Sequence, residues 1–263
     1  MSKYPKIIAH RGMSALAPEN TMAAFAACID HGVKCFEFDV DIIGDGSLIC
    51  IHDDKLDRTT DGKGGYYNLD YSAIRKLDAG KWFDQKYTFE RIPELASVIE
   101  LMNKSQLDAN LEIKPCLGGT VLREKLIQRV AVALQQLEPQ RGLVISSFDP
   151  ELLWMAGKAM PTRRFAGLVE TKHDEPLLEQ VQMWLEVAAK FPETGASLEA
   201  LHVDNQGLTE AAVRMMKDAG YQVRVWTVNE LERAEELAQW GVDAIFTDEA
   251  HLFPAADRAV SAF

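Results

Sequence analysis

The sequence predicts an α/β fold, a TIM (β/α)8-type barrel with a small inserted subdomain after a hairpin at the second strand. Three observations indicate this fold. Short apolar runs alternate with amphipathic stretches, one pair of runs is joined too tightly for a helix, and one long aromatic-rich segment interrupts the alternation. The length of 263 residues agrees, because single α/β barrels often run to about 250 residues.

Apolar runs of strand length recur along the chain. They cover residues 7–10, 35–40, 48–52, 107–113, 143–147, 165–169, 200–203, 222–227 and 244–247. Helix-like stretches separate most of them, at residues 21–31, 94–102, 121–137, 151–160, 179–190, 209–219 and 230–240. Strands that are apolar almost throughout and alternate with helices indicate a parallel sheet covered on both faces.

Two of the helix-like stretches carry clear end signals. Thr209 and Asn229 are the expected N-caps, because their side-chain oxygens can accept first-turn N–H groups. Gly220 and Gly241 follow the last turns, where glycine adopts the left-handed conformation at little cost.

One connection is too short for a crossover helix. The segment DIIGDGS joins the runs at residues 35–40 and 48–52, and a parallel crossover needs a dozen or more residues. A hairpin around residues 44–46 is the natural interpretation. Setting its return strand aside leaves eight runs, the number that a closed parallel barrel requires.

Residues 53–91 are too long for an ordinary loop. The segment holds several glycines and many aromatic residues, so we interpret it as an inserted subdomain that caps one end of the barrel. The alternative is a partly disordered loop, which the aromatic content disfavours. We therefore expect one domain over residues 1–263 with an insert at about 53–91.

Composition and charge exclude some classes of function. The formal net charge is −12, which disfavours nonspecific binding to nucleic acid and stable association with anionic membranes. No stretch approaches the roughly 18 apolar residues of a membrane span. The four cysteines form no CxxC pair and are expected to be free thiols. A cytoplasmic location is expected, and the oligomeric state stays open.

The motif His10-Arg11-Gly12 ends the first predicted strand. In an α/β barrel the carboxyl ends of the strands face the active site. A histidine there can transfer protons near neutral pH, and Arg11 offers a fork of donors that matches phosphate oxygens. The alternative is a structural ion pair, and this motif alone does not exclude it.

An acidic pair lies inside the second predicted strand. Glu37 and Asp39 are two residues apart, so they point to the same face of the strand. Burying two carboxylates together is costly unless a cation neutralises them, and oxygen ligands suit Mg²⁺ or Ca²⁺. The alternative is a solvated acidic face, which the apolar neighbours disfavour.

Three further charged or titratable residues extend this pattern. Pairing across the hairpin places His52 opposite Glu37, so two histidines flank the acidic pair as a general acid and a general base. Glu112 ends another apolar run and is a third candidate metal ligand. Lys114 shares its face and can stabilise charge on a phosphoryl group, although a mutual Glu112–Lys114 ion pair accounts for this motif equally well.

Two aromatic residues near strand ends are candidates for substrate binding. Trp226 and Phe148 could form an apolar wall of the site, although core packing explains each of them equally well. His202 also ends a strand, but nothing else in the sequence assigns it a role.

Taken together, the motifs resemble the glycerophosphodiester phosphodiesterase family, in its bacterial cytoplasmic form. They are HRG, PENT, EFDV, HDDKLDRTTDGKG, LEIKP, SSF, VWTVN and GVDAIFTD, in the order of the family and spanning residues 7 to about 248. Phe38 stands where the family often has Leu, and Glu94 where Thr is usual. Neither position is a ligand.

This resemblance implies a TIM barrel whose metal ligands are Glu37, Asp39 and Glu112. It implies His10 and His52 as the acid–base pair, with phosphate contacts from Arg11 and Lys114. The expected reaction cleaves a small glycerophosphodiester to sn-glycerol 3-phosphate and an alcohol, with Mg²⁺ or Ca²⁺ as cofactor. Either water or the neighbouring glycerol hydroxyl can be the nucleophile.

Three other functions compete with this one. A lysophospholipase D-type hydrolase of another lipid-derived diester would call for a membrane-binding patch, which the acidic charge disfavours. A non-catalytic phosphodiester-binding protein would lack one of the histidines or carboxylates, and all five are present. A barrel aldolase or isomerase needs a different base or a Schiff-base lysine.

Overall fold

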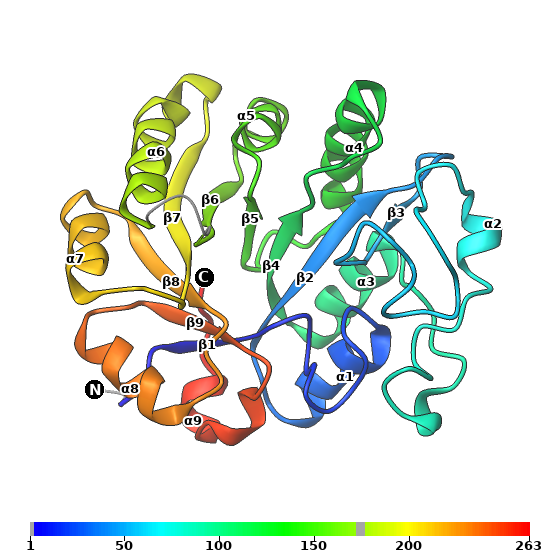
Figure 1. Cartoon of the computed structure of the whole chain (residues 1–263), viewed down its shortest axis with the longest axis horizontal. Helices are drawn as coiled ribbons and strands as arrows, with labels where there is room; N and C mark the ends of the chain where they lie inside the picture. Colours follow the sequence, from blue (N-terminus) through cyan, green and yellow to red (C-terminus); the bar gives the residue numbers. More distant parts are fainter. Residues whose placement is uncertain (1–2, 172–176) are drawn as a thin grey trace.

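A computed structural model describes residues 3–171 and 177–263. In these residues eight parallel strands close into a barrel, in the order β1-β9-β8-β7-β6-β5-β4-β2, and the β1–β2 pairing closes the ring. The predicted TIM barrel is confirmed (Figure 1). The eight strands are β1 (Lys6–Ala9), β2 (Cys35–Ile42), β4 (Asp108–Ile113), β5 (Leu143–Ser147), β6 (Arg164–Val169), β7 (Ser197–Asp204), β8 (Gln222–Trp226) and β9 (Ala244–Thr247).

Helices follow the strands and surround the barrel, as Figure 1 shows. The longer ones are α1 (Met22–Asp30), α3 (Leu95–Ser105), α4 (Thr120–Ala133), α5 (Pro150–Ala159), α6 (Leu177–Lys190), α7 (Glu210–Asp218) and α8 (Leu231–Gln239). Shorter helical turns are α2 (Tyr71–Ile74), η1 (Gln85–Tyr87), η2 (Leu134–Gln136), η3 (Phe191–Thr194), η4 (Ala250–Leu252) and α9 (Ala255–Arg258). Within the described part of the chain, none of the helices has the length and apolarity needed to cross a membrane.

The two faces of each strand have different roles, because successive side chains alternate. Outward residues such as Phe36 and Phe38 pack on Phe25 of α1, at ring-centroid distances of 5.0 and 5.9 Å, within the main core between sheet and helices. Inward residues include a small apolar layer with Ile8 and Phe246. Other inward positions of β2 and β4 carry polar side chains, the carboxylates of Glu37, Asp39 and Glu112 and the amide of Asn110, which places polar chemistry inside the barrel.

The hairpin after β2 is shorter than predicted. Strand β3 covers only Leu48–Ile49 and pairs with β2 in antiparallel register. The prediction that the strand continues to His52 is wrong, because the chain turns from β2 to the returning end of the insert. Ile49 forms a bridge with Glu94, and the N–H of Cys50 donates to the carbonyl of Pro93. His52 therefore reaches the barrel from a loop.

The segment between β3 and α3 forms a second hydrophobic cluster together with Ile43 and Ile49 of the hairpin. The buried members of this cluster are Ile43, Ile49, Ile51, Leu56, Tyr66, Ile74, Ala79 and Ile92. In Figure 1 the segment, which includes α2, lies at one side of the barrel, beside β2. This separate cluster supports the interpretation of residues 53–91 as an insert. The division into one domain with an insert at about 53–91 stays a prediction.

Most of the predicted local features are present. All four cysteines are buried free thiols. Thr209 caps α7 and accepts from the N–H of Ala212, and Gly220 and Gly241 have φ values of 92° and 88°. Asn229 is not the N-cap of α8, a position that Glu230 takes. The side chain of Asn229 is engaged elsewhere, as described below.

Candidate active site

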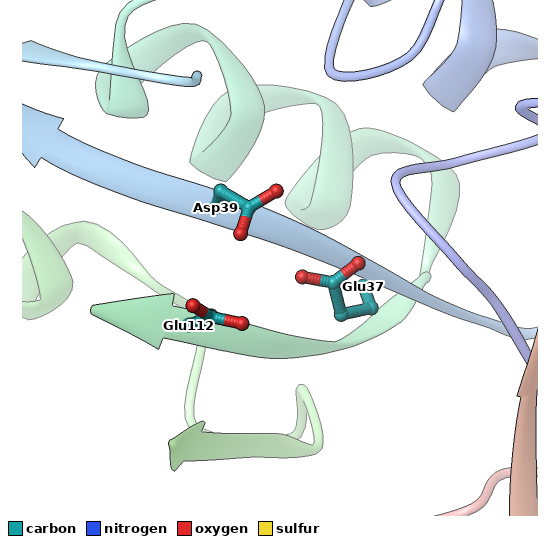
Figure 2. Close-up of side chains that lie close together, drawn as sticks. All are labelled: Glu37, Asp39 and Glu112. Carbon is teal, nitrogen blue, oxygen red and sulfur yellow. The ribbon is translucent and has the colours of Figure 1, made fainter. Parts of the chain in front are cut away.

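Three carboxylates meet inside the barrel. Glu37 and Asp39 lie on β2, and Glu112 lies on β4, where it pairs in register with Asp39. One oxygen from each lies within 4.8 Å of the others, and all three side chains are buried. Figure 2 shows the three carboxylates pointing toward one another. We call this group the acidic cluster.

Burial and mutual repulsion make the full ionisation of this cluster unfavourable. Burial, with the charges of Asp39 and Glu112, raises the pKa of Glu37 well above its usual range. Burial likewise raises the pKa of Glu112 to about 7. Burial alone would also raise the pKa of Asp39, but the positive charges of Lys114 and Arg11 hold it well below its usual range. The cluster is therefore built to receive positive charge.

Two cationic side chains lie beside the cluster. Lys114 Nζ lies 2.7 Å from Glu112 Oε1 and 3.3 Å from Asp39 Oδ1. Arg11 Nε lies 3.6 Å from Asp39 Oδ2, and the backbone N–H of Arg11 donates to Glu37 at 2.8 Å. The Glu112–Lys114 ion pair is present, and both residues also belong to the larger group.

Each predicted catalytic histidine pairs with an aspartate. His10 Nδ1 lies 2.8 Å from Asp248, and His52 Nδ1 lies 2.7 Å from Asp53. Burial opposes ionisation of Asp248, but its hydrogen bond with His10 holds its pKa well below the usual range. Hydrogen bonding to Arg58 does the same for the pKa of Asp53. Because both aspartates are ionised acceptors, each Nδ1 carries a proton and each Nε2 remains available for chemistry.

These groups share one pocket at the mouth of the barrel. The pocket holds about 370 Å³ of empty volume and is lined by His10, Arg11, Glu37, His52, Asn110, Glu112, Phe148, Leu168, Trp226 and Phe246. Phe148 and Trp226 meet edge to face, with ring centroids 5.6 Å apart, and form an apolar part of the lining. A small molecule that carries one anionic and one apolar part fits this division.

A family model matches the chain over most of its length. Residues 10–252 match the glycerophosphoryl diester phosphodiesterase family. The chain belongs to this family. A glycerophosphodiester phosphodiesterase of Caldanaerobacter subterraneus subsp. tengcongensis is 34% identical over 243 residues, which are 92% of this chain and 93% of that protein. One of Bacillus altitudinis is 32% identical over 257 residues, which are 97% of this chain and 96% of that protein.

Solved structures agree with this assignment. A phosphodiesterase of Oleispira antarctica, in complex with the product sn-glycerol-3-phosphate, has a TM-score of 0.83 and 33% identity, and the match covers 95% of both chains. The enzyme is therefore a phosphoric diester hydrolase with glycerophosphodiester phosphodiesterase activity.

All nine residues predicted for the site come together in the enzyme. Seven line the pocket. The other two lie directly beside it, because Asp39 contacts Arg11 and Lys114 contacts Glu112. His202 does not line it. It is fully buried deeper in the barrel, with Nε2 3.0 Å from Arg224 Nη1, and burial lowers its pKa well below the usual range.

Several polar residues around the site were not predicted. Asn20 donates to Asp39 at 2.7 Å, and Glu19 accepts from Arg11 at 2.8 Å. Both residues belong to the PENT motif, whose Thr21 caps α1. Asn229 donates to Asp248 at 2.8 Å. Asp53, directly after His52, was the one partner that its position in the sequence could have revealed.

Proposed function

We propose that the enzyme hydrolyses glycerophosphodiesters to sn-glycerol 3-phosphate and an alcohol, with the aid of a divalent cation and two histidines. The acidic cluster, in the pocket that both histidines also line, is the observation that carries this proposal. It combines a place for positive charge, two imidazoles and an anion-binding arginine in one pocket. The similar phosphodiesterase of Oleispira antarctica, which was solved in complex with this product, supports it.

The residues present fit a bound Mg²⁺ or Ca²⁺. Glu37, Asp39 and Glu112 offer only oxygen donors, which both ions prefer, and the raised pKa values of two of them mark a need for added positive charge. A cation held there would supply neutralisation of the phosphodiester charge. The choice between Mg²⁺ and Ca²⁺ is left to experiment.

The chain's own residues supply orientation and proton transfer. Arg11 and Lys114 contact the phosphate oxygens and hold the diester beside the cluster. One histidine accepts a proton at Nε2 from the nucleophile, which is water or the neighbouring glycerol hydroxyl. If the hydroxyl attacks, a water molecule must then open the resulting cyclic phosphate to give sn-glycerol 3-phosphate. The other histidine donates a proton from Nε2 to the leaving alcohol. Asp53 and Asp248 keep both rings in the required orientation.

Metal binding should change how stability depends on pH. The pKa of Glu112 rises from 4.5 to about 7 on folding, so the stability that this group contributes is present below 4.5 and is lost as the pH rises through about 7. A bound cation replaces the proton. We expect the gain in Tm on adding Mg²⁺ or Ca²⁺ to increase from pH 5.5 to pH 8, measured by differential scanning calorimetry. An equal gain at every pH would contradict this expectation.

Trp226 and Phe148 are proposed to hold the glycerol part of the substrate. Trp226→Ala removes one half of the apolar wall while leaving every charged group in place, so we expect KM to rise with a smaller change in kcat. The measurement is steady-state kinetics with glycerophosphocholine. Exposed Trp82, 40% accessible, provides the control variant Trp82→Ala. An unaltered KM in Trp226→Ala would leave the residue with a packing role only.

A head-group panel tests the proposed function. Purified, chelator-treated enzyme is assayed for release of sn-glycerol 3-phosphate from choline, ethanolamine, glycerol and inositol diesters, with and without each metal. We expect release only with added metal and with at least one of these diesters. Absence of release from all of them would refute the proposal. The cytoplasmic location stays a prediction.

A further inference from the structure

Arg58, in the insert, is bonded to two carboxylates at once. Its Nε and Nη2 donate to Asp53 at 2.7 and 2.8 Å. Its Nη1 and Nη2 donate to Glu19 at 2.6 and 2.8 Å. Four N–H groups of one guanidinium are thereby in use. Arg58 itself does not line the catalytic pocket, and 44% of its side chain is exposed.

The first carboxylate, Asp53, contacts the catalytic histidine His52. Asp53 Oδ1 accepts both from Arg58 and from His52 Nδ1, the latter at 2.7 Å. His52 comes from a loop and not from the strand ladder, so β-sheet pairing does not fix its ring. Asp53 fixes the ring, and Arg58 in turn fixes Asp53 by a two-point contact.

The second carboxylate, Glu19, contacts Arg11, the arginine proposed to bind the phosphate. Glu19 Oε1 accepts from both Arg58 Nη2 and Arg11 Nη1, each at 2.8 Å. The backbone of Arg11 has a φ of 54°, a conformation that a residue with a side chain keeps only when its surroundings hold it there. The loop of Glu19 is part of that support, because the N–H of Asn20 donates to the carbonyl of Arg11.

One guanidinium therefore connects both sides of the site, in the order His52–Asp53–Arg58–Glu19–Arg11. An ordinary exposed ion pair contributes little to stability or function. This one differs because each of its carboxylates also holds a residue of the site. A lysine could supply the charge but not the planar fork that engages two carboxylates by two bonds each.

We propose that Arg58 is a positioning residue that sets His52 through Asp53 and Arg11 through Glu19. The insert thus takes part in assembling the site. The inference rests on the proposed roles of His52 and Arg11. We therefore expect the variants to change different kinetic constants. Asp53→Asn should lower kcat, and Glu19→Gln should raise KM for the diester. Arg58→Ala should do both.

The kinetic experiment compares Arg58→Ala and Arg58→Lys with Arg123→Ala. Arg123 is a matched control, because it also bridges two carboxylates, Asp149 and Glu151, neither of which contacts a histidine or Arg11. A misplacement of about 1 Å can cost on the order of 10²-fold in rate, so we expect kcat/KM to fall about 10- to 100-fold in both Arg58 variants and to stay within about twofold in Arg123→Ala. Millimolar guanidinium should restore activity to Arg58→Ala and not to Asp53→Asn.

Imidazole nitrogen NMR supplies a readout that does not depend on turnover. The Nδ1–H signal of His52, assigned by its loss in His52→Ala, should be sharp in the wild-type enzyme, exchange-broadened in Arg58→Ala, and sharp again with guanidinium. If the wild-type enzyme releases no glycerol 3-phosphate, the proposed function is refuted. The NMR test of Arg58 is still valid in that case, because it does not require turnover. An unchanged His52 signal in folded Arg58→Ala, or wild-type kinetics in Arg58→Lys, would overturn the inference.

Discussion

Glu112→Gln is expected to lower kcat/KM for glycerophosphocholine by about 10³-fold or more, because a catalytic cation contributes several kcal/mol and each 1.36 kcal/mol is tenfold in rate. The amide has the shape of the carboxylate but lacks its charge, so it weakens cation binding without opening a cavity. The measurement is steady-state kinetics at a fixed Mg²⁺ or Ca²⁺ concentration that just saturates the wild-type enzyme.

Stability separates this effect from unfolding. The pKa of Glu112 is raised by burial to about 7, so its charge at pH 8 opposes folding in the metal-free protein. Glu112→Gln should therefore be at least as stable as the metal-free wild type while being nearly inactive. Glu100→Gln, on the exposed side of α3, is the matched control and should keep full activity. Activity within tenfold of the wild type in Glu112→Gln would argue against its role as a ligand.

The second large effect is expected for the two histidines. Proton transfer by a positioned side chain contributes about 10²- to 10⁴-fold, so His10→Ala and His52→Ala should each lower kcat by that order. Both variants should still bind the divalent cation, because neither residue belongs to the acidic cluster. Calorimetric metal titration and single-turnover kinetics measure the two properties separately.

The control for these variants is His31→Ala. His31 follows α1, and its ring lies 3.0 Å from the carbonyl of Ala27, outside the catalytic pocket. Its loss should leave kcat within about twofold, as for most surface substitutions. If His10→Ala or His52→Ala retains a near-wild-type kcat while folded, that residue has no part in proton transfer.

The fold followed from the sequence because the signals were local. Each barrel strand is a short apolar run, and the short segment at residues 44–46 identified the one return strand that had to be set aside. The length of β3 could not be predicted in this way. Residues 50–52 look like the continuation of a strand, but their hydrogen-bond partners include Pro93, which comes near only when the insert folds back.

Site residues could be predicted where a charged residue interrupts an apolar strand that is expected to be buried. The carboxylates at positions 37, 39 and 112 stand inside apolar strands. Burying a charged group there costs free energy, so a compensating partner is expected. Glu19, Arg58 and Asp248 lie in polar loops, where turns and solvation account for them. The contact of Asp248 with His10 joins residues 238 positions apart and exists only once the barrel has closed, so no local pattern indicates it.

The most direct test is to measure metal binding and catalysis on the same sample. Metal-free enzyme is titrated with Mg²⁺ and with Ca²⁺ by calorimetry, and release of sn-glycerol 3-phosphate is followed at each added concentration. We expect one ion per chain, activity that rises along the same binding curve, and loss of both in Glu112→Gln. Full activity in enzyme shown to contain no divalent metal would contradict the account.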